Sequence, residues 1–405
     1  MTGTRSRQKN KKENWEETIL KKIISLLLAA LMLLSLCACS TSKPAETKGN
    51  DSPASTGSTT PAATGEKLTI GVQIWSTDDI LGGHTKQMLD AAGKVWNVEF
   101  QFDTPAYSAD AQIASIENFI AAGVDGIMSV DCDESTTVQN ASLCKAAGIP
   151  YITVYRRVDD AANKAELEQN EFFLGEIANS DYELGVSLAQ AVIDAGKTKI
   201  AYIKTPNGNA MDAREQGISD TLAKAGIEVE TTCTLSDSYE ASEWTNFVEN
   251  ILNVYPETDC ILMSCGSNGG IDAAIAKIAT MGFAETCTTA CVDSPDGAAE
   301  CIADGSLLAV GGQIYNSALY GAVIMVNYLQ GHPLAEGIID YPQLQPIISG
   351  SEEADASQKY MIDALPYNDE ELADMLVSNN PNYTLETLME EGNGFTIAKL
   401  IEKFK

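Results

Sequence analysis

Two short segments of the sequence have residue types that could bind an ion, but neither has the pattern that such a site needs. SCGSNGG (residues 264–270) could wrap a phosphate with its backbone N–H groups, but it lacks the lysine of a P-loop. DCDES (residues 131–135) could offer carboxylates to calcium, but it lacks the ligand pattern of an EF-hand loop. We therefore expect no ion site in either segment and interpret DCDES as a solvated loop.

Hydrolytic chemistry also has little support in the sequence. The chain has only two histidines, His84 and His332, which is too few for a His-rich metal site and argues against a conventional Ser-His-Asp triad. It has no G-x-S-x-G segment, the nucleophile elbow of α/β-hydrolases. A catalytic pair of carboxylates stays open as the enzymatic alternative, because the chain contains 57 Asp and Glu residues.

Other polar and aromatic residues stand directly after apolar runs that predict strands. Parallel sheets bind ligands at the carboxyl ends of their strands, so we expect a binding site among these residues. The segments are WSTDD (75–79), DTPAYS (103–108), YRRVDD (155–160), PNGNAMDAR (206–214), VDSPDG (292–297) and GGQIY (311–315).

The elements that position these segments alternate between strand and helix. LTIGVQIW (68–75) and VDGIMSV (124–130) are short runs rich in β-formers, and residues 108–123 between them place Ile116 and Phe119 on one helical face. Strands that alternate with helices predict βαβ units and parallel sheets, which define an α/β fold class.

Several local features are predicted with this pattern. Ser180 and Glu183 form a capping box at the start of a helix, and IEVETT (227–232) alternates like a strand. Residues 365–376 and 384–392 have the character of helices added at the end of the chain.

The chain from residue 68 to about 346 resembles the type I periplasmic binding proteins, the ribose- and galactose-binding group of ABC importers. The resemblance implies two doubly wound parallel-sheet lobes, joined by a multi-strand hinge and closing over a sugar. It rests on the following segments, which stand in the family's order: AAGVDGIMSV (121–130), KAAGIPYITVYRR (145–157), NSDYELG (179–185), AREQGI (213–218), YPETDCILMSC (255–265), CVDSPDGAAECIADG (291–305) and VGGQIYNSALYG (310–321).

The resemblance also implies ligand contacts by position. Arg156 and Arg214 match arginines that hydrogen-bond sugar hydroxyls, and Tyr239 falls where an aromatic ring stacks on the sugar. Asp293 and Gln313 match polar contacts from the second lobe and the hinge. A guanidinium fork suits vicinal hydroxyls, and a carboxylate accepts from them.

Simpler interpretations of these residues stay open. Arg156 and Arg157 could form a surface pair, and Arg214 could make a salt bridge on its own helix. Trp244 could take the role of Tyr239.

Departures from the family pattern indicate a rebuilt pocket. Tyr155 replaces an Asp, Cys265 replaces an Asn, and Asp78 falls where the family often has Asn. Residues 80–81 are Ile and Leu where the family has paired phenylalanines, and Trp75 is either the missing platform or part of the core. Ribose itself is therefore not expected as the ligand, and another sugar, polyol or small polar solute stays open.

The N-terminal region predicts export. Lysines precede an uncharged apolar run (residues 23–36), which is shorter than a bilayer-spanning helix and is typical of a secretory signal. Leu36, Ala38 and Cys39 resemble a lipobox, so we expect Cys39 to be lipidated, with translation starting at residue 1 or near residue 20. The alternatives are an ordinary signal peptide and a metal-binding or redox pair formed with Cys37.

Composition limits the partners of the chain. The net charge of −31 argues against nucleic acid, because phosphates attract positive surfaces. Residues 40–67 are rich in Ser, Thr, Pro, Ala and Gly, which predicts a flexible tether. The eight cysteines after Cys39 permit disulfides in an exported protein, but small buried thiols fit their scattered spacing better.

We therefore predict a lipid-anchored solute-binding protein on the outer face of the cell membrane, monomeric and without cofactor, metal or catalysis. It would deliver a small polar ligand, a sugar, to an ABC permease and its ATPase; the alternative is a sensor that presents ligand to a chemoreceptor or histidine kinase. The predicted regions are a signal peptide (1–38), a lipidated cysteine and linker (39–67), an N-terminal lobe (68–178 and 313–340), a C-terminal lobe (179–312), and a hinge crossing with a helical extension (341–405).

Overall fold

The computed structural model describes residues 67–206, 211–236, 238–266, 269–312 and 315–405. The predicted signal peptide, Cys39, the linker and Gln313 lie outside these residues. No helix among the described residues has the length and apolar character needed to cross a bilayer.

The first sheet is wholly parallel, with strand order β11-β5-β4-β3-β1-β2. Its central strands are buried on both faces, because helices cover each side, and this is why they appear in the sequence as continuous apolar runs. The strands are β1 (Leu68–Gln73), β2 (Val98–Asp103), β3 (Gly126–Ser129), β4 (Tyr151–Val154), β5 (Phe173–Asn179) and β11 (Ile339–Gln343).

The second sheet repeats this arrangement with strand order β12-β10-β9-β8-β6-β7. Only its short edge strand β12 is antiparallel, pairing with β10. The strands are β6 (Ile200–Lys204), β7 (Thr231–Thr234), β8 (Cys260–Met263), β9 (Thr288–Val292), β10 (Leu307–Gly311) and β12 (Ile347–Ile348).

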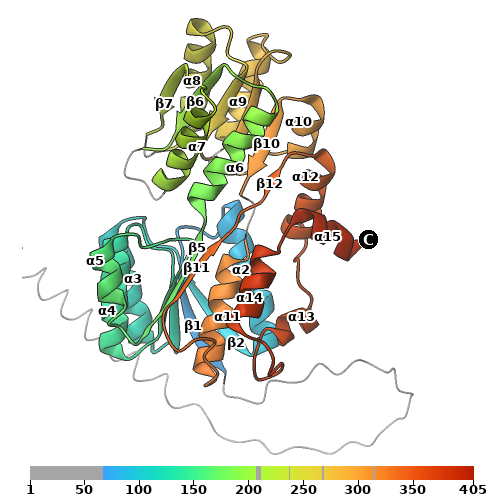
Figure 1. Ribbon diagram of the computed structural model, residues 1–405. Coiled ribbons are helices and arrows are strands. Elements are labelled where there is room, and N and C mark those ends of the chain that lie inside the picture. The colour runs from blue at the N-terminus through green and yellow to red at the C-terminus, as the bar shows by residue number, and fades with distance from the viewer. Residues whose placement is uncertain (1–66, 207–210, 237, 267–268, 313–314) are drawn as a thin grey trace, which may run out of the picture. The chain divides into compact units, whose positions relative to one another are not determined.

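Each sheet and its helices form one lobe (Figure 1). The N-terminal lobe has α2 (Ile80–Trp96), α3 (Ala109–Ala122), α4 (Glu134–Ala147), α5 (Ala161–Leu167) and α11 (Ser317–Leu329). The C-terminal lobe has α6 (Asp181–Asp194), α7 (Asp212–Lys224), α8 (Ala241–Val254), α9 (Gly270–Thr280) and α10 (Ala298–Asp304). The α/β fold of two doubly wound lobes is thus confirmed.

Three crossings join the sheets, between β5 and α6, between β10 and α11, and between β11 and β12. The predicted lobe boundary at residue 340 falls inside β11, because that strand continues to Gln343 before the chain crosses. The exact lobe limits stay a prediction.

The capping box predicted at α6 is wrong. Ser180 is the N-cap residue, but its side chain makes no capping hydrogen bond, and its backbone (φ −77°, ψ 73°) is not in the extended conformation that caps favour. The helix begins instead with Asp181, whose carboxylate binds Arg214.

The C-terminal extension consists of α12 (Ser351–Ser357), the π-helix η1 (Gln358–Ile362), α13 (Asp369–Asp374), α14 (Leu385–Asn393) and α15 (Ile397–Phe404). Helix α12 packs on α10 of the C-terminal lobe, and α15 packs on α12. Helices α13 and α14 pack on α2 and β11 of the N-terminal lobe. The extension therefore belongs to both lobes.

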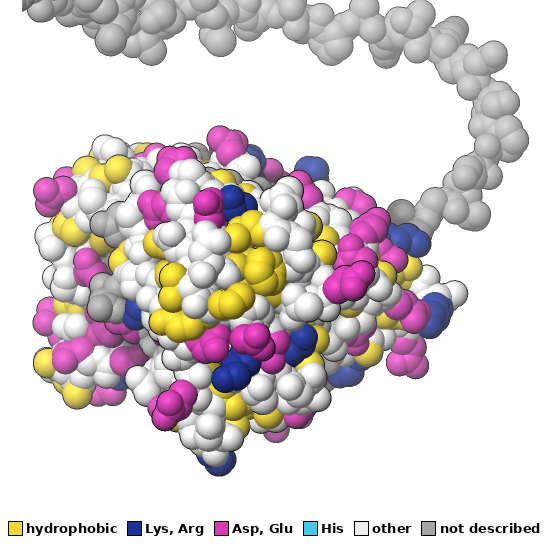
Figure 2. Space-filling model, turned by 90° about the horizontal axis from the view of Figure 1, so that it is seen from above, with side chains coloured by type: hydrophobic (Ala, Val, Ile, Leu, Met, Phe, Trp, Pro, Cys, Tyr) yellow, Lys and Arg dark blue, Asp and Glu magenta, His cyan; other side chains and the backbone are white. Residues whose placement is uncertain are grey.

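Acidic side chains occur widely on the surface. In the view of Figure 2 they surround a patch of hydrophobic side chains, and basic side chains are sparser. This matches a chain with 57 acidic and 26 basic residues.

Candidate functional site

Backbone strain marks three of the predicted site residues. Among the described residues, the non-glycine residues with positive φ are Asn97, Tyr155, Tyr239 and Asp293. Asn97 ends α2 as its C-cap, where a left-handed residue is ordinary. The other three, at φ 61°, 48° and 71°, follow strands or precede a helix and are not helix C-caps, so their strain marks them as candidates for a functional role.

Tyr155 is fixed at the carboxyl end of β4. Its hydroxyl group is 2.9 Å from Thr85 Oγ1 and donates to the carbonyl oxygen of Tyr315 at 3.0 Å. Burial raises the pKa of Tyr155 to about 12, so its hydroxyl stays protonated. The residue is 1% exposed and therefore supports the site more than it offers surface to a ligand.

Trp75 and Arg156 lie together on this support. The rings of Trp75 and Tyr155 are arranged edge to face, with their centroids 6.3 Å apart and their planes at 70° to each other. The Arg156 guanidinium carbon lies 6.0 Å from the centroid of the Trp75 ring. Trp75 packs against the core but is only partly buried, so part of its ring surface stays available as a platform.

Tyr107 holds Arg156 and was not among the site residues predicted from the sequence. Its hydroxyl accepts from Arg156 Nε at 3.2 Å and Nη2 at 3.0 Å and donates to the Asp131 carbonyl at 3.3 Å. The guanidinium also donates from Nη1 to the Tyr155 carbonyl at 3.1 Å. The signal was present, because Tyr107 is the aromatic residue of the segment that follows β2.

Asp79, rather than Asp78, is integrated into the site. Its carboxylate accepts from Gly82 N at 2.7 Å, as the N-cap of α2, and from Trp75 Nε1. It therefore orients the Trp75 ring. The side chain of Asp78 is exposed, and its backbone N–H bonds Ser76 Oγ at 3.0 Å. A capping aspartate just before a helix was a readable signal for Asp79.

Two carboxylates anchor the loop that carries Arg156. Glu134 accepts from the backbone N–H groups of Asp159 and Asp160 at 2.9 and 3.0 Å, and Glu176 accepts from Val158 N at 3.0 Å. Burial, aided by Asp340, raises the pKa of Glu176 to about 7. These bonds fix the loop independently of any ligand.

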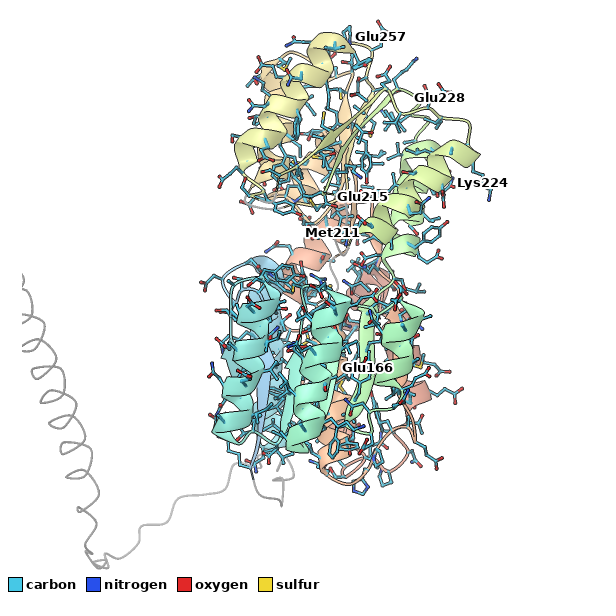
Figure 3. All side chains as sticks on the ribbon, turned by 90° about the vertical axis from the view of Figure 1, so that its left-hand side faces the viewer. Glu166, Met211, Glu215, Lys224, Glu228 and Glu257 are labelled. Carbon is cyan, nitrogen blue, oxygen red and sulfur yellow. The ribbon has the colours of Figure 1, made fainter. Side chains whose placement is uncertain are left out.

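In the C-terminal lobe Arg214 is bound within its own lobe. It is 6% exposed, donates to Asp181 Oδ1 from Nε at 3.0 Å and Nη2 at 2.6 Å, and donates to the Ser264 carbonyl from Nη1 at 2.7 Å. Met211 and Glu215 lie at the same end of α7, and Lys224 lies at the other (Figure 3). Most N–H donors of Arg214 are thus occupied within the protein, which favours a supporting role for this residue over a ligand contact.

Asp293 and Cys265 stand beside Arg214. Asp293 accepts from Gly266 N at 2.9 Å and is exposed to solvent, yet surrounding protein raises the pKa of its carboxyl group, against the effect of Arg214. Burial raises the pKa of Cys265 to about 12, so this thiol is a buried neutral group.

The structure decides between the two aromatic candidates near residue 240. Trp244 is 0% exposed in the core of the C-terminal lobe and cannot stack on a ligand. Tyr239 is partly buried and keeps some accessible surface. The interpretation of Trp244 as a replacement for Tyr239 is therefore wrong.

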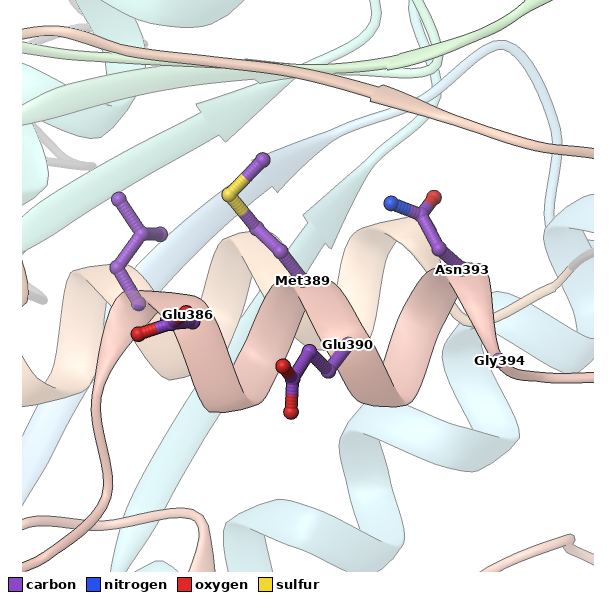
Figure 4. A pocket seen from close by; sticks show the side chains of 6 residues that line it. Glu386, Met389, Glu390, Asn393 and Gly394 are labelled. Atoms are coloured by element: carbon purple, nitrogen blue, oxygen red, sulfur yellow. The ribbon is translucent and has the colours of Figure 1, made fainter.

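A hollow on the surface of the extension is separate from these residues (Figure 4). It follows one face of α14, and none of the predicted ligand contacts lines it. Its lining consists of Leu385, Glu386, Met389, Glu390, Asn393 and Gly394. We assign no role in solute capture to it.

The family model for the periplasmic binding protein domain matches residues 70–333. The chain therefore belongs to that family, in its type I form, as the resemblance implied. The match covers both sheets except for the edge strands β11 and β12 and the first two residues of β1.

Two curated relatives of this chain are named as binding proteins. A putative rhizopine-binding protein of Rhizobium meliloti is 27% identical over 48% of this chain and 62% of its own length. The ribose import binding protein of Bacillus subtilis (strain 168) is 23% identical over 65% of this chain and 81% of its own length.

Solved structures confirm the fold. A periplasmic solute-binding protein of an ABC transporter from Actinobacillus succinogenes 130z, with bound D-allose, has a TM-score of 0.62 and 17% identity. It covers 73% of this chain and all of its own. A solute-binding protein from Bacillus halodurans C-125, with bound myo-inositol, has a TM-score of 0.60 and 21% identity, covering 72% of this chain and 98% of its own.

Proposed function

We propose that this chain is an extracytoplasmic solute-binding protein that captures a sugar or polyol between its lobes and delivers it to an ABC importer. The observation that carries the proposal is the fixed group of Trp75, Tyr107 and Arg156, an aromatic face beside a guanidinium held in place without ligand. Such a group offers a ring platform and donors to a polyhydroxylated molecule.

The opposite lobe supplies acceptors. The exposed carboxylate of Asp293 can accept hydrogen bonds from hydroxyl groups, and Tyr239 offers a second aromatic surface. A ligand that contacts both groups favours the state in which the lobes are closed, because these contacts exist together only there. Asp78, Tyr155, Arg214, Cys265 and Gln313 complete the proposed contacts, of which Tyr155, Arg214 and Cys265 act chiefly as buried supports.

The names of the relatives support this ligand class. They include proteins described as binding rhizopine, ribose and xylitol, and solved neighbours hold D-allose and myo-inositol. The relatives are named as binding proteins, which supports a role in capture without catalysis. The proposed anchor is a lipid on Cys39, with residues 40–67 as tether and a monomeric body.

Thermal unfolding with D-ribose, xylitol, myo-inositol and D-allose tests the proposal. A ligand that binds only the folded state raises Tm with its concentration relative to Kd, so one of these probes should stand out. Arg156→Ala should abolish that shift. Arg157→Ala is the matched control, because Arg157 bonds Asp159 and Asp340 on the surface.

Two results would contradict the proposal. One is the absence of any Tm shift with all four probes at millimolar concentration. The other is a shift that survives in Arg156→Ala, which would remove the Trp75–Arg156 group from the site.

A further inference from the structure

The three crossings between the lobes meet in one buried polar network. Gln343 Oε1 accepts from Ser317 Oγ at 2.6 Å, and Gln343 Nε2 donates to Asn316 Oδ1 at 2.8 Å. The Gln343 carbonyl accepts from Ser180 N at 2.9 Å. Asn316, Ser317 and Gln343 are 0% exposed, so solvent cannot replace these bonds.

The C-terminal extension adds two further crossings. Residues 363–368 connect η1, which follows α12, to α13, and residues 394–396 connect α14 to α15. Since α12 and α15 pack with the C-terminal lobe while α13 and α14 pack on the N-terminal lobe, each of these connections passes from one lobe to the other.

Tyr367 joins these additional crossings to the buried network. Its hydroxyl accepts from Asn316 Nδ2 at 3.2 Å and lies 2.7 Å from the Tyr320 hydroxyl. Asn316 Nδ2 also donates to Tyr320 at 3.0 Å. The Tyr367 ring lies 6.3 Å from that of Phe395 on the last crossing. One residue of the extension thus contacts the hinge and both added crossings.

The residues just before α11 are also bonded to the candidate site. The Tyr155 hydroxyl donates to the Tyr315 carbonyl at 3.0 Å, directly before Asn316. Tyr155 in turn supports Trp75. Residues 315–316 are therefore bonded to the candidate site through Tyr155 and to the extension through Tyr367.

We propose that Tyr367 is a positioning residue of the binding site, which sets the geometry of the hinge segment 315–317 and thereby the balance between open and closed lobes. It acts through Asn316 and touches no ligand. The effect on affinity rests on the proposed function, whereas the effect on lobe geometry does not.

Tyr367→Phe isolates this role. The substitution keeps the ring against Phe395 and removes only the hydroxyl group. The extension stays docked through other bonds, because Trp96 Nε1 donates to the Leu372 carbonyl at 2.6 Å and Asn327 bonds Met375 and Val377.

Tyr383→Phe is the matched control. Tyr383 is a buried tyrosine of the same extension, and its hydroxyl donates to Glu391 at 2.9 Å, within the extension itself. The Tyr383→Phe substitution therefore removes one buried tyrosine hydroxyl without touching the hinge network. Both variants should lower Tm.

Lobe geometry without ligand is the first readout. Spin labels on unnatural amino acids at Glu166 and Glu228, exposed residues of different lobes (Figure 3), give the distance distribution between the lobes. Tyr367→Phe should broaden or shift this distribution, while Tyr383→Phe should leave it as in the parent protein. An unchanged distribution in Tyr367→Phe would overturn the proposal.

Affinity is the second readout, with D-ribose, xylitol and myo-inositol as calorimetric probes. For any probe that binds the parent, Tyr367→Phe should raise Kd roughly three- to tenfold, the equivalent of one buried hydrogen bond, and Tyr383→Phe should not. Equal Kd values in both variants would overturn the inference. Failure of all probes to bind the parent would contradict the proposed ligand class, and the label distances would still decide the role of Tyr367.

Discussion

Arg214 directs two of its N–H groups at a single carboxylate oxygen, Asp181 Oδ1, at 2.6 and 3.0 Å. The pair links the start of α6 to α7 and is largely buried, with side-chain exposures of 8% and 15%. Asp181 is the first residue of α6, directly after the first crossing between the lobes, so the pair holds the start of this helix against α7.

Arg214→Ala should destabilise the protein strongly. The substitution leaves the Asp181 carboxylate and the Ser264 carbonyl buried without their donor, at a cost of about 3–5 kcal/mol in the free energy of unfolding. Urea denaturation measures this loss. Lys86→Ala, which breaks the exposed pair with Asp90, should cost less than about 1 kcal/mol. Equal losses would show that the Arg214 pair is not buried as described.

Gly217→Ala should also destabilise the C-terminal lobe. A Cβ at Gly217 would lie 2.2 Å from the Tyr182 carbonyl oxygen, because α6 and α7 approach each other there through glycine. The helices must separate to admit a methyl group, and we expect a loss of about 1–3 kcal/mol by chemical denaturation. Gly337→Ala, where a Cβ meets open space, is the control. A neutral Gly217→Ala would contradict this close packing.

Glu176 should make stability depend on pH. Its pKa is about 7 in the folded protein against 4.5 ordinarily, so between these values the folded state keeps a proton that the unfolded state releases. The free energy of unfolding therefore falls as pH rises through this window. In Glu176→Gln the free energy of unfolding should no longer fall with pH. Relative to the parent protein, it should therefore increase between pH 5 and 8, by up to roughly 3 kcal/mol. Parallel profiles for the two proteins would contradict the burial of a neutral carboxyl group. The exposed Glu166→Gln controls for general charge effects.

The eight cysteines of the folded body should differ in reactivity. None of them is bonded to another in the described residues, and those that are partly exposed are Cys132, Cys233 and Cys301. Iodoacetamide should modify these three first in the native protein, and all eight only after denaturation. Burial raises the pKa of thiols such as Cys144 and Cys265 to about 12, which slows their reaction further. Mass spectrometry of peptides measures the order, and early labelling of Cys265 would contradict it.

The repeating pattern of the sequence was sufficient for the fold. Strands β3 and β4 are buried at every position, and such strands have apolar runs that need no knowledge of distant residues. The strand predicted at residues 227–232 lies further along the chain in the structure, where β7 is Thr231–Thr234. Ile227 and Val229 do pack against the core, but as the approach to the strand.

The site was harder to predict, because its contacts join distant residues. Nothing near Arg214 in sequence indicates Asp181, 33 residues away. Trp244 could have been assigned correctly, since Trp244, Val248 and Ile251 form a helical stripe and all are buried. The helices of the extension were predicted, but their packing on different lobes depends on contacts that no local pattern encodes.

The two ends of the folded body belong to different lobes. Strand β1 belongs to the first sheet, whereas α15 packs on α12, which in turn packs on α10 of the C-terminal lobe. A fluorescent protein fused after Lys405 would therefore travel with one half of the molecule, and a dye placed ahead of Leu68 with the other. Labels ahead of Leu68 and after Lys405 would thus report movement of the lobes relative to each other without an insertion inside either lobe.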